Sequence, residues 1–422
     1  MLLGAVADDF TGATDLASML VRHGMRTVQV FGVPDAATAP LDADAVVVAL
    51  KSRTIEAPEA VRLSLGALAW LRAAGARQIF FKYCSTFDST AHGNIGPVAD
   101  ALLDALGADF TIACPALPEN GRTICHGHLF VGDVLLSESG MKDHPLTPMT
   151  DANLVRVLGR QTKHAVGLVP YSVVDAGPAA IGAAFAALRA GATRHAIVDV
   201  LSERHLLDLG TACAELPLVT GGSGIAMGLP ANFRRRGDLA AAAEEADALP
   251  PVPGSAAVIA GSCSPATLGQ VAAMAERYPA LRVDPLRLAG RVEAAAAEAV
   301  AWALPGLAAG PVLIYASAPP DEVRSTQQVL GRAEAGALVE AALAAIARGL
   351  VQRGVRCLVI AGGETAGAVV QALDVRALRI GAAIDPGVPW TVSLGERPIA
   401  LALKSGNFGA RDFFEKALRQ RP

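Results

Sequence analysis

The sequence predicts an α/β protein of two domains, each a mainly parallel sheet flanked by helices, with a cleft between the domains. Its length of 422 residues exceeds what one ordinary hydrophobic core requires, so two domains are expected. Short β-rich runs, each followed by a turn and an Ala/Leu-rich helix, recur in both halves, and this alternation indicates parallel sheets. Glycines suited to a left-handed helix terminus follow the expected helices at Gly24, Gly75, Gly107 and Gly354.

The domain boundary is predicted from a change of composition. The acidic segment LAAAAEEADAL, expected to be a helix, runs into PPVPG, and a proline-rich connector of this kind is stiff. We therefore expect a first domain over residues 1–236, a linker over 237–255 and a second domain over 256–422.

The composition excludes several classes of protein. Hydrophobic residues make up 52% of the chain, but much of this is alanine, and no apolar run reaches the roughly 20 residues that span a bilayer. The segment 336–350 comes nearest and is interrupted by Glu340 and Arg348. The start MLLGAVADDF lacks the basic segment and cleavage site of a secretory signal. We therefore expect no membrane partner.

Charge and cysteine content limit the partners and the compartment that we expect for the protein. A net charge of −4 disfavours a nucleic-acid partner, because no broad basic surface is implied. The 6 cysteines are scattered without a C-x-x-C pair, so unpaired thiols in a reducing, cytoplasmic compartment are expected.

An acidic turn follows the first expected strand. Asp8, Asp9 and Thr11 lie where the carboxyl end of a parallel strand faces a ligand crevice. One carboxylate is expected to accept the proton of an attacking hydroxyl, and the other to bind sugar hydroxyls or magnesium. The alternative is structural, because Asp9 or Thr11 also suits the N-cap of the following helix.

Basic and hydroxyl side chains follow two further strands. Lys82, Ser85 and Thr86 end the strand QIFF, and this set suits a small carboxylate or phosphate. Arg122, in CPALPENGRT, is able to clamp a carboxylate in a bidentate way. The alternatives are an ordinary turn leading to a helix and a surface arginine.

Three glycine-containing loops follow strands of the second half. Glycines let phosphate oxygens approach the backbone, and helix N-termini direct N–H donors at them. Lys404 is expected to neutralise the charge that develops on a transferred phosphoryl group. The alternative is that these are structural turns of an α/β fold, since neither a Walker motif nor G-x-G-x-x-G after a strand is present. The loop residues expected to bind a nucleotide are Ser262, Ser264, Gly362, Gly363, Glu364, Thr365, Gly406 and Asn407.

The sequence does not identify metal ligands. His126 and His128 are two residues apart, a spacing that would place both on one face of a strand. No further ligand lies close to them in the sequence, so a transition-metal site is disfavoured.

Taken together, these motifs resemble the four-carbon acid sugar kinase family over nearly the whole chain. The resemblance rests on ADDFTGATD, KYCSTFDST, CPALPENGRT, GGSG, GSCSPAT, AGGETAGAV and LKSGNFG, in that order. It implies a sugar-acid-binding first domain with Asp8, Asp9, Lys82, Ser85, Thr86 and Arg122. It also implies an ATP-binding second domain with the three glycine loops and Lys404, and we expect the ATP to be bound with Mg²⁺.

The segment ESGMKDHPLTPMTD, with KSGNFG, is similar to the branch of this family that phosphorylates the C4 hydroxyl of 3-oxo-tetronate. Relatives acting on D-threonate or D-erythronate remain the alternative within the family. A non-catalytic regulator that binds sugar acid and nucleotide is the alternative of another class. A homo-oligomer is compatible with either.

Overall fold

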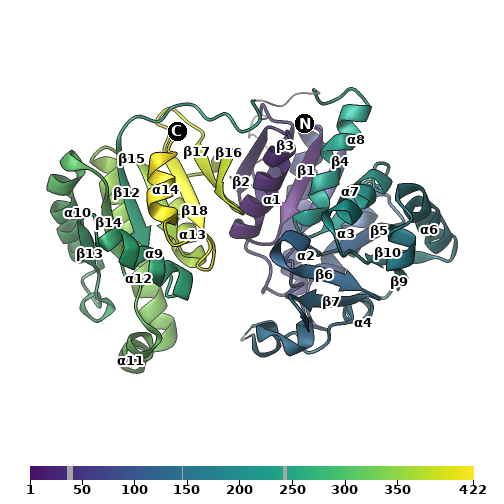
Figure 1. Ribbon diagram of the computed structural model, residues 1–422, viewed down its shortest axis with the longest axis horizontal. Helices are drawn as coiled ribbons and strands as arrows, with labels where there is room; N and C mark the ends of the chain where they lie inside the picture. Colours follow the sequence, from purple (N-terminus) through teal and green to yellow (C-terminus); the bar gives the residue numbers. More distant parts are fainter. Residues whose placement is uncertain (36–40, 145, 241–244) are drawn as a thin grey trace. The chain divides into compact units, whose positions relative to one another are not determined.

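The computed structural model describes residues 1–35, 41–144, 146–240 and 245–422. The chain divides into two compact units, Met1–Ala246 and Asp247–Pro422. Each unit is a sheet flanked by helices, so the predicted α/β class is confirmed (Figure 1).

The sheet of the first unit is parallel throughout. Its strands are almost fully buried near the centre, because helices cover both faces. In spatial order they are β2 (Thr27–Phe31), β3 (Ala45–Ala49), β1 (Leu3–Ala7), β4 (Gln78–Lys82), β11 (Leu218–Gly221), β5 (Thr111–Cys114), β10 (Thr193–Val198) and β9 (Ala165–Val169).

Helices connect these strands on both faces of the sheet. One group comprises α1 (Phe10–Arg22), α6 (Pro178–Ala190) and α7 (Glu203–Ala212), and the other α2 (Ala57–Ala73), α3 (Ile95–Leu106) and α4 (Leu154–Gly159). The short helices α5 (Tyr171–Val174) and α8 (Pro230–Arg235) complete the unit.

A topological switch point lies between two neighbouring strands of this sheet. From β1 the chain passes through α1 to β2 on one side, and from β4 it passes through α3 to β5 on the other. Because right-handed crossovers in opposite directions place their helices on opposite faces, the carboxyl ends of β1 and β4 flank a crevice. Asp8 and Lys82 stand at those two strand ends.

One antiparallel element of the first unit was not predicted. The segment after β5 forms β6 (Arg122–Cys125), β7 (His128–Val131) and β8 (Val134–Leu135), which pair antiparallel in a separate sheet. Short strands joined by tight turns leave little periodic signal in a sequence, which is why these three strands were not predicted.

The sheet of the second unit is parallel on one side and antiparallel on the other. In spatial order its strands are β13 (Ala280–Arg282), β14 (Val312–Tyr315), β12 (Ser255–Ala260), β15 (Val355–Ala361), β18 (Ala400–Lys404), β17 (Val388–Ser393) and β16 (Ala377–Asp385).

Helices of the second unit also cover both faces of its sheet. Side chains of α9 (Pro265–Ala275) and α14 (Phe413–Arg419) share one buried cluster with the sheet. The other helices are α10 (Val292–Ala309), α11 (Pro320–Leu330), α12 (Arg332–Gln352) and α13 (Gly363–Ala372). The chain leaves β12 through α9 toward β13 and leaves β15 through α13 toward β16, so a second switch point lies between β12 and β15.

Among the described helices one is long and apolar enough to cross a membrane. This is α10, whose mean hydropathy is 1.2, rather than the segment 336–350 that the sequence suggested. In the structure α10 packs on α12, and its Glu293 binds Arg348 at 2.9 Å, as expected of a helix in an α/β layer.

The four predicted glycine termini are confirmed. Gly24, Gly75, Gly107 and Gly354 have φ values of 84°, 90°, 64° and 98°. These left-handed values strain any residue with a Cβ atom and suit glycine.

The helix expected over residues 239–249 falls partly outside the described residues, which omit 241–244. Residues 245–247 form a turn, and β12 begins at Ser255.

Candidate functional site

The acidic turn joins β1 to α1. Asp9 is the N-cap of α1, and its carboxylate accepts hydrogen bonds from the backbone N–H of Gly12 at 3.0 Å and from the Thr11 hydroxyl at 2.7 Å. The capping interpretation is thus confirmed. The side chain of Asp9 is still 25% exposed, whereas that of Asp8 is 4% exposed, so Asp9 is the carboxylate that solvent or a ligand can reach.

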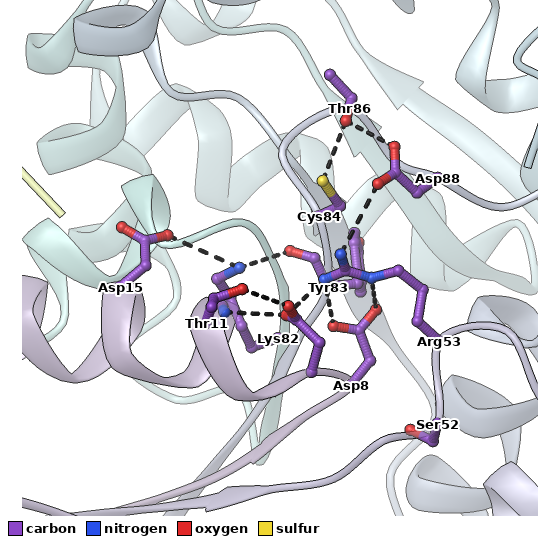
Figure 2. A network of polar contacts seen from close by, with 12 residues as sticks. Asp8, Thr11, Asp15, Ser52, Arg53, Lys82, Tyr83, Cys84, Thr86 and Asp88 are labelled. Atoms are coloured by element: carbon purple, nitrogen blue, oxygen red, sulfur yellow. Dashed lines mark hydrogen bonds and ion pairs between the residues drawn. The ribbon is translucent and has the colours of Figure 1, made fainter. Parts of the chain in front are cut away.

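Arg53, which the sequence interpretation missed, ties the acidic residues together. Its Nε and Nη2 donate to the two carboxylate oxygens of Asp8 at 2.9 and 2.8 Å, and Nη2 also lies 2.6 Å from Asp9 Oδ1. Nη1 is 3.8 Å from Asp88 Oδ2, and Figure 2 shows the guanidinium between Asp8 and Asp88. Bidentate pairing of this kind fixes both position and orientation.

Burial and charge act differently on the two adjacent aspartates. Burial raises the pKa of Asp8, and the charge of Arg53 opposes the rise. Burial also acts on Asp9, but the charges of Arg53 and Lys82 and the hydrogen bonds from Thr11 and Gly12 outweigh it, so its pKa lies below the ordinary value. Asp9 is therefore held as an ionised carboxylate at the positive end of α1.

Lys82 is the last residue of β4 and is only 2% exposed. Its ammonium donates to the carbonyl of Tyr83 at 2.8 Å and lies 3.8 Å from Asp15 Oδ2 (Figure 2). A Cβ atom on Gly12 would lie 3.2 Å from the ammonium, which places this charge against the first turn of α1. The structure thus brings Lys82 together with Asp9.

The turn after β4 is polar and strained. Thr86 donates to Asp88 Oδ1 at 2.6 Å and lies 3.0 Å from the Cys84 sulfur, and Ser85 is half-buried beside it. Phe87 and Asp88 have φ values of 65° and 48°, each in the left-handed region that costs a non-glycine residue about 1–3 kcal/mol. Through Asp88 and Arg53 this turn is joined to the acidic turn.

Arg122 lies apart from this network. Its Nη1 donates to the carbonyl of Asn120, and within the described part of the chain its Nε has no partner although it is buried. No recorded contact among the described residues joins it to the two aspartates or Lys82. Its loop is tied to α1 instead by an ion pair of 3.0 Å between Glu119 and Arg22.

The second unit contains a cavity of about 810 Å³ at its own switch point. Five of the predicted residues line it, and α11 and α12 supply part of the opposite wall through apolar side chains such as Val323 and Val339. A pocket of this size, largely apolar with a few polar groups, suits a nucleotide or a ligand of similar size. The predicted residues in the lining are Ser262, Gly362, Gly363, Glu364 and Thr365.

The three predicted loops pack closely against one another at their glycines. A Cβ atom on Gly261 would lie 2.3 Å from Thr365 Oγ1, and one on Gly406 would lie 2.3 Å from Ser262 Oγ. Gly362 has a φ of 128°, in the region that favours glycine, and precedes the first turn of α13. The first N–H groups of that helix lack intrahelical acceptors, and residues of its first turn line the cavity.

Lys404 lies beneath the third loop rather than in the cavity lining. Its side chain is fully buried, and its ammonium donates to Thr267 Oγ1 and to the carbonyls of Ser405 and Gly406, each at 3.0 Å. Burial without a nearby carboxylate lowers its pKa to about 8. Ser264 caps α9 and donates to the carbonyl of Gly406 at 2.6 Å, so it too acts on the loop.

Sequence reasoning missed the residues that organise these sites. Arg53 lies in the segment KSR directly after the apolar run AVVVAL. Two basic residues at the end of an expected buried strand were the feature of the sequence that could have identified it. Asp15, Asp88 and Thr267 carried no comparable signal, because single polar residues within helices and turns are common.

The His126 and His128 pair does not lie on one strand. His126 is in the turn between β6 and β7, with φ at 49°. Over the described ranges, no group of three or more His, Cys, Asp or Glu side chains is placed to hold a metal ion. All 6 cysteines are free thiols, as predicted.

Family models match both units of the chain. A model described as a sugar-binding N-terminal domain matches residues 3–229, and one described as a nucleotide-binding C-terminal domain matches residues 257–414.

Curated relatives match the chain along almost its whole length. Proteins named 3-oxo-tetronate kinase from Burkholderia multivorans and Cupriavidus necator are 65% and 63% identical to it, with 99% of this chain and 97% of each relative covered.

Two crystal structures also resemble the whole chain. One from Salmonella typhimurium LT2 has a TM-score of 0.92 at 45% identity, covering 100% of this chain and 99% of that one. One from Haemophilus influenzae has a TM-score of 0.85 at 46% identity, with 99% of each chain covered.

Proposed function

We propose, from the fact that this chain belongs to the four-carbon acid sugar kinase family, that it transfers the γ-phosphoryl group of ATP to the C4 hydroxyl of 3-oxo-tetronate. The observation that carries the proposal is the pair of switch points. One holds a carboxylate and a buried ammonium at the ends of β1 and β4, and the other opens a nucleotide-sized cavity between β12 and β15. A kinase must bind a phosphoryl acceptor and a nucleotide, and the two switch points suit these two ligands.

The sugar acid binds in the first unit, at the crevice between β1 and β4. Lys82 attracts the substrate carboxylate, while Thr11, Ser85 and Thr86 supply hydrogen bonds to hydroxyls. Arg122 is a second candidate for the carboxylate, since its Nε lacks a partner within the described chain.

Asp9 is the residue that accepts the proton of the attacking hydroxyl. It is the more exposed of the two aspartates, with 25% of its side chain accessible against 4% for Asp8, although its own oxygens also accept hydrogen bonds from Arg53, Gly12 and Thr11. The low pKa of Asp9 keeps it ionised, so it orients the hydroxyl and takes its proton as the new O–P bond forms. Phosphoryl transfer requires little more from the protein than such positioning and charge neutralisation.

ATP binds in the cavity of the second unit. The first turn of α13 and the Gly261–Ser262 backbone hold the phosphates, and the apolar wall formed by α11 and α12 receives the base. Lys404 contributes positive charge from below the loop and holds the loop in place.

Mg²⁺ accompanies the nucleotide. Magnesium retains several waters and is commonly bound by one or two carboxylates together with substrate phosphates, so a ready-made protein cage is not required. Glu364, in the first turn of α13, and Glu340 both line the cavity and are oxygen donors of the right kind. Bound there, the ion would neutralise charge on the phosphates.

We place this activity in the cytoplasm, where ATP is available and thiols stay reduced. The test is an assay of ADP release over a panel of 3-oxo-tetronate, D-threonate and D-erythronate. ADP release fastest with 3-oxo-tetronate supports the proposal. Release only with D-threonate or D-erythronate would correct the substrate, and binding of sugar acid and ATP without any ADP release would indicate a regulator.

A further inference from the structure

Three carbonyl groups of the loop between β18 and α14 accept hydrogen bonds from one side-chain amide, that of Gln270. Gln270, on α9, directs its Nε2 at the carbonyl oxygens of Phe408, Gly409 and Ala410, at 3.1, 2.9 and 3.0 Å. The side chain is 1% exposed, so this contact is a buried one. The opposite amide orientation would set Oε1 against three carbonyl oxygens, whereas the nitrogen donates its two hydrogens to the three of them, with at least one hydrogen shared.

A carbonyl in the first part of the same loop is also held by side-chain donors. The carbonyl oxygen of Gly406 accepts hydrogen bonds from Ser264 Oγ at 2.6 Å, Thr267 Oγ1 at 2.8 Å and Lys404 Nζ at 3.0 Å. The loop carbonyls from Gly406 to Ala410 named so far therefore point toward α9 and the ammonium of Lys404.

The end of the loop is fixed separately by a carboxylate. Asp385 accepts a hydrogen bond from the backbone N–H of Ala410 at 2.9 Å and pairs with Lys416 at 2.5 Å. Gln270 thus holds the middle of a loop whose two ends are anchored by other residues.

Because these carbonyl groups point toward α9, we expect the backbone N–H groups of the loop to point away from it. Within the described chain, no acceptor is recorded for the N–H of Gly406, Asn407 or Gly409. Successive N–H groups that point the same way form a concave site for an anion. Gly406 lies against Ser262, which lines the cavity, so this site adjoins the region where phosphates are expected.

We propose that Gln270 is a positioning residue for nucleotide binding: it holds the 406–410 loop so that the N–H groups of Gly406 and Asn407 face the ATP phosphates. This inference rests on the proposed function of the second unit. Gln270 touches no substrate itself. It acts because the carbonyls of Phe408 and Gly409, whose donor among the described residues is Gln270, would otherwise turn toward water, and the N–H groups would lose their common direction. The carbonyl of Ala410 also accepts a hydrogen bond from the Phe413 N–H at 3.0 Å.

The test replaces Gln270 by methionine, which has a similar length and no donor. Gln371→Met is the matched control, because Gln371 is an exposed residue on α13 of the same unit. Calorimetry should show that Gln270→Met weakens ATP binding about tenfold or more. Binding of 3-oxo-tetronate should stay within about twofold of the wild type. Hydrogen exchange should rise at residues 405–410, and Gln371→Met should change none of these.

Several outcomes separate this inference from the proposed function. Unchanged ATP affinity in Gln270→Met, with the wild type binding ATP normally, overturns the role of Gln270 alone. Equal losses of ATP and sugar-acid binding would indicate a general structural defect and would also overturn it. Failure of the wild type to bind ATP overturns the proposed function instead. If Gln270→Met does not fold, Gln270→Asn, which keeps the amide but shortens its reach, carries the same comparison.

Discussion

Arg53 and Asp8 form a two-point ion pair at the carboxyl end of β1, with Nε 2.9 Å from Oδ2 and Nη2 2.8 Å from Oδ1. The same Nη2 lies 2.6 Å from Asp9 Oδ1, so one guanidinium sets the geometry of both carboxylates. Asp8 therefore holds Arg53 by two contacts, and in the proposed function Asp9 meets the substrate. This division of labour yields separate predictions for the two aspartates.

Asp8→Asn should destabilise the first unit. The substitution leaves the guanidinium of Arg53, whose side chain is 22% exposed, without its two-point partner. Because Arg53 keeps its contact with Asp9 at 2.6 Å and asparagine still accepts one hydrogen bond, we expect a loss of about 1–3 kcal/mol. Urea unfolding should show this loss, and the double variant Asp8→Asn/Arg53→Met should lose less than the sum of the two single variants. Additive losses would show that the pair is not coupled.

Asp9→Asn should instead reduce turnover with little loss of stability. Asparagine is an equally good N-cap, so the helix start is preserved. A general base contributes about 10²-fold or more to rate, and the ADP-release rate should fall by that factor. Near-normal turnover in a well-folded Asp9→Asn protein would refute the base assignment.

Lys404 should make ATP affinity and stability respond to pH in opposite directions. Its folded pKa of about 8 lies below the ordinary value of 10.5, so between these values the unfolded chain binds more protons. The contribution of Lys404 to stability should therefore rise as the pH increases through this interval. ATP affinity should fall over the same interval, because the neutral amine no longer attracts phosphate.

The Lys404→Met variant provides the comparison for that prediction. Subtracting its pH profiles from those of the wild type removes other titrating groups, such as the thiols. Binding of 3-oxo-tetronate should show no such difference. An ATP affinity in Lys404→Met that matches the wild type from pH 7 to pH 10 would remove Lys404 from the nucleotide site.

Gly406→Ala should impair nucleotide binding through steric conflict. The new methyl group would lie 2.3 Å from Ser262 Oγ and 3.1 Å from Ser264 Oγ, so the serine hydroxyls must turn away from their present positions or the loops must shift. We expect a loss of ATP affinity of about tenfold or more, measured by calorimetry. Gly269→Ala is the control, since its Cβ atom would meet nothing within 4 Å. Equal ATP affinity in the two variants would argue against close packing of these loops at the site.

Much of this architecture follows from local patterns in the chain. The buried strands that lead to Asp8, Lys82 and Gly362 can be predicted from the sequence, because their apolar runs stop at polar or glycine residues. The carboxyl ends of neighbouring parallel strands meet at one edge, so the alternation of strands and helices predicts that the turns after them lie at the same edge.

What the sequence did not reveal depends on contacts between distant residues. The ion pair of Arg53 with Asp8 spans 45 positions, and the contacts of Gln270 with the 406–410 loop span about 140. The sequence around a glutamine in an Ala-rich helix does not show whether its side chain is buried and hydrogen-bonded to a distant loop or exposed to solvent. The inward position of Lys404 was missed for the same reason, since its partners include Thr267 on another element.

The most direct test of the kinase assignment is phosphorus NMR of a reaction containing the purified protein, ATP, Mg²⁺ and 3-oxo-tetronate. We predict that the γ-phosphate signal of ATP is replaced by those of ADP and a new phosphomonoester on the C4 oxygen, and that Asp9→Asn slows this conversion strongly. Release of inorganic phosphate without a phosphomonoester, or no consumption of ATP with any four-carbon sugar acid, would contradict the account.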